Sequence, residues 1–251
     1  MNGALRLKKI REMLDVEEFL DMERLKSELD ASESTIRRDL AGLEAEGLLK
    51  RVYGGAMAMQ ARDPSLDFAF QSTHMAAEKR RIAVVAASLV HDNETVILDG
   101  GSTVAAVARE LAGRSLHVIT NSLPIAEVFG DSRQVEITLT GGFLYPRVRA
   151  TVGPLCEQVF ASVTADVLIM GIGGVTEAGF SNSNTLIVGP ELKMIQAARK
   201  LVIVTDHSKF GRGSVVHIAP LDEADVVVSD SGLTREHQDM LKAHGVEVLL
   251  A

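Results

Sequence analysis

Short runs of apolar and often β-branched residues recur from about residue 75 to the end of the chain. The runs are "TVILD", "LHVIT", "VEITLT", "ADVLIMGI", "KLVIVTD", "ADVVVSD" and "VEVLL". Helical segments separate most of them, for example Val104–Leu111, Leu192–Arg199 and Arg235–Ala243. Continuous apolar runs are typical of strands buried on both faces, and their alternation with helices favours a mainly parallel sheet. Residues 75–251 are therefore predicted to form one α/β domain.

Residues 1–60 follow a different pattern, in which short amphipathic helices replace the alternation of strand and helix. Apolar residues recur at three- and four-residue intervals near the start, and two further helices are predicted at about 22–29 and 33–46. Gly47 lies where a glycine commonly ends a helix. The apolar face of the last helix is formed by Ile36, Leu40 and Leu43.

The segment "LLKRVYGGA" follows this last helix and alternates weakly around a Gly-Gly pair, which predicts a small hairpin or wing. Residues 61–74 contain Pro64 and show no period, so we place a linker there. The predicted fold is thus a small winged helix–turn–helix domain over residues 1–60, a linker, and an α/β domain over residues 75–251.

The placement of basic residues in the first domain is informative, although the chain carries a net charge of -8. Residues 1–60 hold 10 Lys/Arg and 12 Asp/Glu, whereas a surface that binds nucleic acid is normally basic. In a helix–turn–helix, however, the second helix enters the major groove and presents donors from its N-terminal end. The donors there are Ser34, Thr35, Arg37 and Arg38, and Lys50 and Arg51 follow where flanking phosphates would lie.

The same residues also fit a solvated helix face. Glu33 and Arg37 are four residues apart on the helix, so their side chains can pair with each other. The charge pattern by itself leaves two hypotheses open, a DNA-binding helix and a helix that serves structure or protein contact.

Composition excludes several other classes of protein. Hydrophobic residues make up 46% and charged residues 24% of the chain, as in ordinary soluble globular proteins. The single cysteine, Cys156, cannot form an intramolecular disulfide, and it lies in an apolar run that predicts packing in a core. The N-terminus does not resemble a signal peptide, and the apolar runs are shorter than the roughly 20 residues of a membrane helix. We expect a cytoplasmic protein.

Polar and glycine residues follow several of the predicted strands. In open α/β sheets, ligands bind outside the carboxyl ends of the strands. Glycines allow close approach of the backbone, while hydroxyls and the amides of a helix start donate to phosphate. The residues in such positions are Asp99, Gly100, Gly101, Ser102, Thr103, Asn121, Gly141, Gly142, Gly171, Gly173, Asp206 and Lys209. They predict a site for a small anionic ligand, and no cofactor is expected.

The motif "TIRRDL", followed by "LE", a glycine, a basic residue and "GGA", resembles the signature of the DeoR family of bacterial transcriptional regulators. The order of "EKRRIA", "LDGGSTV", "TNS", "TGG", "VGP", "GIGG" and "DHSKFG" resembles the sensor domain of that family. The resemblance implies a fold similar to ribose-phosphate isomerase and glucosamine-phosphate deaminase, with a pocket for a phosphorylated sugar. It adds Glu191 to the pocket, although an acid in the first turn of a helix also has a purely structural use.

The chain departs from the family pattern at three positions. Tyr53 stands where histidine is usual before "GGA", and its hydroxyl can still donate to a DNA phosphate. Val104 and His207 stand where the family often has hydroxyl residues, which bears on the sugar that is accepted.

The resemblance implies a ligand-responsive regulator, most simply a repressor of sugar or polyol catabolism genes. Such a protein would bind operator DNA as a homo-oligomer, a dimer or a tetramer, and a phosphorylated sugar would change its affinity for the operator. A competing hypothesis is an isomerase or deaminase with a DNA-binding appendage, for which Asp99, Asp206 and Glu191 are candidate bases. A sensor of NAD(H) is a third hypothesis, although "GIGGVT" lacks the last glycine of the dinucleotide fingerprint. We predict no metal site, because the histidines show no ligand spacing, and no catalytic residue.

Overall fold

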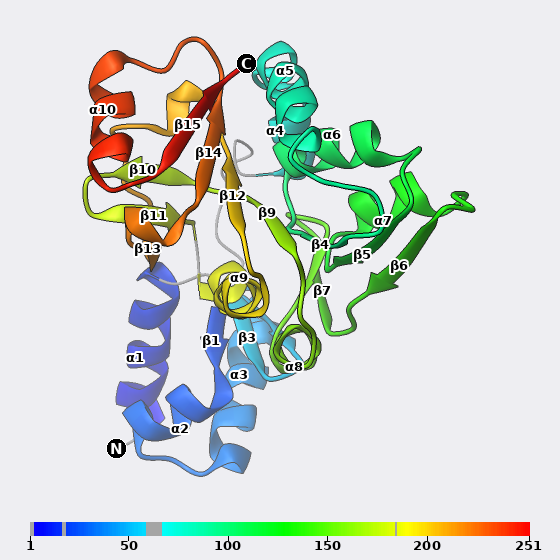
Figure 1. The fold of residues 1–251 in the computed structure, drawn as a ribbon. Coiled ribbons are helices and arrows are strands. Elements are labelled where there is room, and N and C mark those ends of the chain that lie inside the picture. The colour runs from blue at the N-terminus through cyan, green and yellow to red at the C-terminus, as the bar shows by residue number, and fades with distance from the viewer. Residues whose placement is uncertain (1–2, 17–18, 59–66, 184) are drawn as a thin grey trace. The chain divides into compact units, whose positions relative to one another are not determined.

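The structure is a computed structural model of the chain, and it describes residues 3–16, 19–58, 67–183 and 185–251. The chain divides into two compact units, one mostly of the residues before 64 and one of nearly all the later residues. Figure 1 shows the elements of both units. Over the described residues, the first unit has one hydrophobic core and the second has two.

Within the described residues, the first unit consists of three helices and a three-stranded antiparallel sheet with strand order β1-β3-β2. The predicted helices at 22–29 and 33–46 and the predicted hairpin are confirmed, whereas β1 has too few residues to show a period in the sequence. The elements are α1 (Gly3–Val16), β1 (Phe19–Asp21), α2 (Met22–Leu29), α3 (Glu33–Ala45), β2 (Leu49–Val52) and β3 (Gly55–Ala58).

Side-chain caps set where α2 and α3 begin. The Asp21 carboxylate accepts hydrogen bonds from the backbone N–H of Glu23 at 2.8 Å and of Arg24 at 3.1 Å. The Ser32 hydroxyl caps α3 by accepting from the N–H of Thr35 at 3.4 Å. Behind these caps the helices share one buried core, which includes Ile10, Leu25, Leu29, Ile36, Leu40 and Leu43.

The second unit is built on a seven-stranded sheet with the order β15-β14-β12-β9-β4-β5-β6, and every neighbouring pair is parallel. Each apolar run of the sequence forms one of these strands, so the predicted parallel sheet is confirmed. The strands are β4 (Thr95–Leu98), β5 (Leu116–Thr120), β6 (Val135–Leu139), β9 (Val167–Gly171), β12 (Leu201–Val204), β14 (Val226–Ser229) and β15 (Glu247–Leu250).

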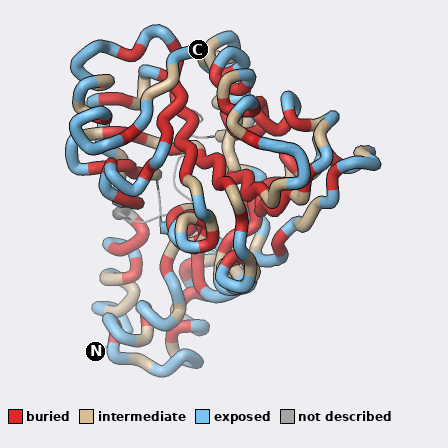
Figure 2. Tube along the Cα trace, viewed as in Figure 1, coloured by how far each residue is buried: buried red, intermediate tan, exposed pale blue. Residues whose placement is uncertain are grey.

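Helices cover both faces of this sheet. Alternate residues of one strand enter different cores, since Val96 and Leu98 join one and Ile97 the other. Figure 2 shows the strands as a continuous buried layer, which explains why the runs are apolar throughout. One core includes α5 (Ala76–Ala87), α6 (Ser102–Leu111) and α7 (Leu123–Phe129), and the other includes α8 (Pro154–Ala161), α9 (Thr185–Ala197) and α10 (Arg235–Ala243). Cys156 of α8 is fully buried, as predicted.

Several short elements were not foreseeable from the apolar pattern. A hairpin and a small antiparallel sheet lie beside the main sheet. They are formed by β7 (Phe143–Tyr145) with β8 (Ala150–Val152), and by β10 (Gly174–Thr176), β11 (Gly179–Asn182) and β13 (Val216–Ala219). None of the described helices combines the length and the apolar character that crossing a membrane requires.

The segment predicted as a linker, 61–74, contains a helix in its second half. Residues 61–66 lie outside the described residues, and α4 (Phe68–Thr73) follows them. The Phe68 N–H donates to the Arg147 carbonyl at 3.0 Å, and the Arg147 guanidinium pairs with Asp67 at 3.1 Å. These interactions attach α4 to the second unit, and a helix of this length is too short to show a period in the sequence.

Candidate functional site

The first candidate surface lies at the N-terminal end of α3. Ser34, Arg37 and Arg38 are exposed there, and Thr35 is half-buried. The capping Ser32 Oγ lies 2.9 Å from the Thr35 Oγ1 and 3.1 Å from the Ser34 Oγ. The predicted hydroxyls therefore form one network around the start of the helix, with their backbone held by the cap.

The four predicted cations of this surface are not equivalent. Arg37 donates to the Glu33 carboxylate at 2.6 Å and 2.8 Å, and this hydrogen bonding lowers the pKa of Glu33. Arg51 likewise pairs with Glu44, whose pKa is lowered by hydrogen bonds from the Arg51 backbone and side chain. Among the described residues, neither Arg38 nor Lys50 has a carboxylate partner. Arg37 and Arg51 thus form ion pairs within the domain, and Arg38 and Lys50 form none with the residues described, although the charge of Lys50 also lowers the pKa of Glu44.

An ion pair links α3 to α1, and the hairpin after α3 carries an exposed tyrosine. The Arg6 guanidinium of α1 pairs with Asp39 of α3, and both side chains are largely buried. Tyr53 lies between β2 and β3 with 78% of its surface exposed, so the hairpin presents the hydroxyl outward.

The second candidate site is a cavity of about 180 Å³ at the carboxyl ends of β4, β5, β9 and β12. Most of the predicted ligand residues line it together. They are Asp99, Gly100, Gly101, Ser102, Thr103, Asn121, Gly171, Gly173, Glu191, Asp206 and Lys209. Val104, one of the departures from the family pattern, lines it as well.

Gly141 and Gly142 are the predicted ligand residues that do not line this cavity. They lie between β6 and β7, and a Cβ on Gly142 would stand 2.6 Å from the Val152 carbonyl oxygen. The φ of Gly142 is also +128°, a conformation that other residues rarely adopt. The close approach of the hairpin strand β8 accounts for this glycine without a ligand.

The start of α6 forms the part of the cavity best suited to an anion. Gly101 caps the helix with a φ of +113°, which favours glycine, and the helix then begins at Ser102. The first N–H groups of a helix lack intrahelical partners, and the helix dipole favours negative charge there. Lys209 also lines the cavity and contributes a positive charge.

Lys79 of α5 is the main cavity residue that the sequence pattern did not predict. Its side chain is only 4% exposed, and its Nζ donates to the Ser102 Oγ at 3.0 Å and to the Gln71 carbonyl at 2.6 Å. The pKa of Lys79 is lowered to about 8, mainly by burial. The charge of Asp206 opposes this shift, and the charge of Lys209 adds to it. The sequence did contain a signal for a buried charge, because Lys79 lies three residues before Ile82 and therefore falls on the apolar face of its helix.

Two carboxyl groups form a second part of the cavity. Burial raises the pKa of Asp99 to about 7, against hydrogen bonds from the Gly100 and Gly171 backbone. Burial and the charge of Asp99 raise the pKa of Glu191 well above its ordinary value, against a hydrogen bond from Asn182 at 2.6 Å.

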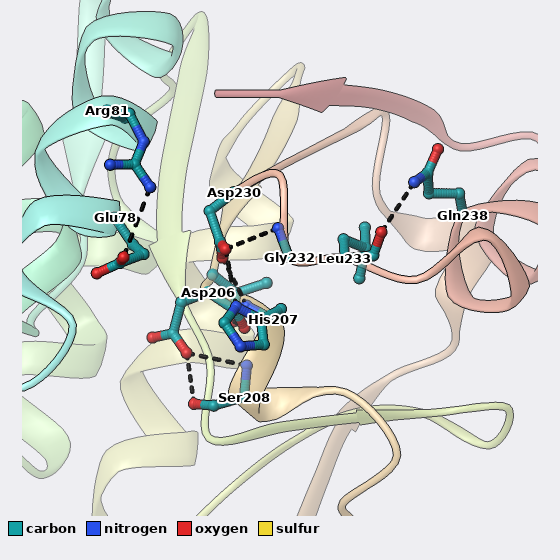
Figure 3. Close-up of polar contacts among 10 residues, drawn as sticks. Glu78, Arg81, Asp206, His207, Ser208, Asp230, Gly232, Leu233 and Gln238 are labelled. Atoms are coloured by element: carbon teal, nitrogen blue, oxygen red, sulfur yellow. Dashed lines mark hydrogen bonds and ion pairs between the residues drawn. The ribbon is translucent and has the colours of Figure 1, made fainter.

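A short 3-10 helix, His207–Lys209, carries Lys209 to the cavity, and Figure 3 shows how it is held. Asp206 caps it by accepting from the Ser208 N–H at 3.1 Å and from the Ser208 hydroxyl. Asp230, just after β14, accepts from the His207 N–H at 2.8 Å and contacts the His207 Nδ1 at 2.7 Å. Burial would raise the pKa of Asp230, but the hydrogen bonds from His207 and Gly232 outweigh it and lower the pKa. His207 therefore orders the element that presents Asp206 and Lys209.

The two units match the two parts of a known regulator family. Residues 6–62 match the model of the DeoR-like helix-turn-helix domain, and residues 74–231 match that of the DeoR C terminal sensor domain. The chain belongs to the DeoR family of transcriptional regulators.

Curated relatives match along nearly the whole chain. The HTH-type transcriptional repressor GlcR of Bacillus subtilis is 33% identical over 98% of this chain and 95% of its own length. The HTH-type transcriptional regulator GolR of Listeria innocua is 34% identical over 98% of both chains. The lactose phosphotransferase system repressor of Lactococcus lactis is 32% identical over 94% of both. These relatives are regulators, and the chain is a regulator and not an enzyme.

Solved structures share part of the α/β fold. Ribose 5-phosphate isomerase A of Methanocaldococcus jannaschii aligns with a TM-score of 0.40 at 18% identity, over 54% of this chain and 55% of that chain. The tetrameric eIF2B-beta2-delta2 complex of C. thermophilum aligns with a TM-score of 0.46 at 14% identity, over 68% and 61%. Both likenesses are partial and weak, and neither bears on function.

Proposed function

We propose that this protein is a transcriptional repressor of sugar catabolism genes whose affinity for its operator is controlled by a phosphorylated sugar. Residues 1–60 bind the operator, residues 61–74 connect the domains, and residues 75–251 bind the effector. The protein acts in the cytoplasm as a homo-oligomer, since helix–turn–helix regulators pair on repeated half-sites.

The DNA-binding part of the proposal is supported by the outward face of α3. Ser34 and Arg38 are exposed at the end of the helix that enters the major groove in this class of domain. Lys50 and the Tyr53 hydroxyl lie on the hairpin after it, where they suit contacts with flanking phosphates.

The observation that carries the phosphorylated effector is the buried Lys79 beside the start of α6. A lysine is almost never buried without a charged partner, yet among the described residues the Lys79 amine donates its hydrogen bonds to neutral oxygens of Gln71 and Ser102. A phosphate at the helix start would accept from the free N–H groups and from Ser102, and would also pair with Lys79 and Lys209. The name of one relative, the lactose phosphotransferase system repressor, supports sugar genes as targets.

The effector changes operator affinity only if it binds two conformations of the protein unequally. The test has two stages. Thermal-shift measurements across a panel of phosphorylated sugars identify ligands, because a ligand of the native state raises the melting temperature. Duplexes selected from a random library by the full chain then serve as operators, and their affinity is measured with and without the best ligand.

Two variants separate the sites. Ser102→Ala is expected to abolish the thermal shift and keep DNA binding, whereas Arg38→Ala is expected to do the reverse. An operator affinity that stays constant at saturating concentrations of every sugar that binds would refute control by the effector.

A further inference from the structure

The cavity contains two buried carboxyl groups that form no ion pair with any cation among the described residues. Asp99 is 3% exposed and Glu191 is 1% exposed, and both line the cavity. Their hydrogen-bond donors are neutral, namely the backbone of Gly100 and Gly171 for Asp99 and the Asn182 side chain for Glu191. Within the part of the chain that the structure describes, no lysine, arginine or histidine pairs with either group. Buried carboxyl groups are usually paired, so these two depart from the rule.

Unused acceptors lie at the same place. The Glu191 Oε2 and the Asn121 Oδ1 are buried and have no hydrogen-bond partner among the described residues. Asn121 is itself 3% exposed and lines the cavity, where its Nδ2 donates to the Thr151 carbonyl at 3.0 Å. Buried acceptors are nearly always satisfied. A ligand that brings hydrogen-bond donors would satisfy the Asn121 oxygen and the ionised form of Glu191.

The lysines of the cavity interact with residues other than Asp99 and Glu191. The Lys79 Nζ is bound to Ser102 and Gln71, and its charge interacts with Asp206 and Lys209. The charge that acts on Glu191 is that of Asp99. Lys79, Lys209 and Asp206 thus form one charged group beside the start of α6, whereas Asp99 and Glu191 form a second, acidic group that has no cation partner among the described residues. A ligand of matching polarity has an anionic group and a cationic group.

We propose that the effector is a phosphorylated amino sugar, whose phosphate binds at the start of α6 and whose ammonium group binds between Asp99 and Glu191. This inference rests on the proposed function, because it assumes that a sugar phosphate occupies the cavity. An ammonium supplies several N–H donors and a positive charge in one group, which a hydroxyl does not.

Binding of an ammonium group is expected to release protons from Asp99 and Glu191, and this release can be measured. Burial raises the pKa of Asp99 to about 7 and that of Glu191 well above its ordinary value, which favours a shared proton on the pair. A cation between them lowers both pKa values, so the pair releases that proton when the ligand binds. Among the described residues, the other cavity group with a shifted pKa is Lys79, which is bound to Ser102 at the start of α6 and would meet the same phosphate in an amino sugar and in a hydroxyl sugar.

The experiment compares two probes that differ in one group, glucosamine 6-phosphate and glucose 6-phosphate. Calorimetric titration of the full chain gives both affinities, and repetition in two buffers of different ionisation enthalpy gives the protons released. The amine is expected to bind about tenfold or more tightly, and to release more protons than the hydroxyl sugar. Glu191→Gln is expected to reduce the ratio of the two affinities to about threefold or less. Glu136→Gln, an exposed residue of β6 outside the cavity, is the matched control and is expected to keep the ratio of the unsubstituted protein.

Equal affinity and equal proton release for the two probes would overturn the inference and leave the proposed function standing. A failure of every phosphorylated sugar to bind would overturn the proposed function and this inference with it. The proton measurement uses the unsubstituted protein, so it tests whether an ammonium group binds between Asp99 and Glu191 even if Glu191→Gln does not fold.

Discussion

The buried Lys79 predicts an unusual dependence of stability on pH. Burial lowers the pKa of this amine from 10.5 to about 8 in the folded protein. Between these two values the unfolded chain holds one more proton than the folded chain, so the free energy of unfolding rises with pH. A lysine that gains an ion pair on folding has a raised pKa and does the opposite, because its stabilisation is lost as pH rises.

The magnitude follows from the shift. One pKa unit corresponds to about 1.4 kcal/mol, and the linkage relation gives a rise of about 2 kcal/mol from about pH 7 to about pH 9.5. Allowance for screening by solvent lowers this figure to about 1 kcal/mol. Lys79→Met lacks the titrating amine and keeps a similar volume. The difference in unfolding free energy between the unsubstituted protein and this variant therefore isolates the contribution of Lys79.

The assay can use the single cysteine. Cys156 is fully buried in the second unit, so pulsed thiol labelling across a urea titration reports the unfolding of that unit. The unsubstituted protein is expected to gain about 1 to 2 kcal/mol relative to Lys79→Met over this pH range. A saturating sugar phosphate is expected to remove most of the gain, because an anion beside Lys79 raises its pKa. A difference that stays flat or falls with pH would refute both the burial of the charge and its role toward phosphate.

Three further predictions concern single positions. Arg38→Ala is expected to weaken operator binding by about 1–3 kcal/mol in gel-shift titrations, and Arg37→Ala by less, because Arg37 must first leave Glu33. Glu33→Gln is expected to strengthen operator binding about twofold by releasing Arg37; an unchanged or weaker affinity at constant salt would contradict the neutralisation seen in the free protein. Gly101→Ala places a side chain on a residue with a φ of +113°, so it is expected to lower the stability of the protein by about 1 kcal/mol or more and to abolish the sugar-phosphate thermal shift. The control is Gly113→Ala, whose added Cβ has no atom within 4 Å and which is expected to leave the thermal shift intact.

Much of the fold could be predicted because its signals are local. The runs that become β4, β9 and β12 are buried on both faces, so nearly every residue is apolar and the pattern is clear in the sequence. The strands β7 and β10 have only three residues each and lack such a pattern. Their pairing depends on segments distant in sequence, which a period cannot encode.

The candidate site likewise contains residues that the sequence could predict and residues that it could not. Ser102 and Lys209 were predictable because polar residues at strand ends meet at one edge of a parallel sheet. Lys79 comes from the first turn of a helix, and only the packing of α5 against α6 brings it to Ser102. The "TGG" of Gly141 and Gly142 resembles the other glycine loops in sequence, but the approach of β8 explains Gly142 by backbone contact. Composition cannot distinguish a glycine that admits a ligand from one that admits a neighbouring strand.

The net charge of -8 does not conflict with a DNA-binding role, since electrostatic attraction acts locally. At physiological salt the screening length is about 8 Å, so carboxylates further away than this contribute little to the field at a DNA phosphate. The relevant acids are those beside the cations of α3 and the hairpin, namely Glu33 and Glu44. They pair with Arg37 and Arg51, whereas Arg38 and Lys50 form no ion pair among the described residues and are the cations that we expect to contact the duplex. If these residues contact DNA as proposed, the ion pairs within the domain would lower its affinity for DNA of any sequence, and selective binding would need contacts strong enough to replace them.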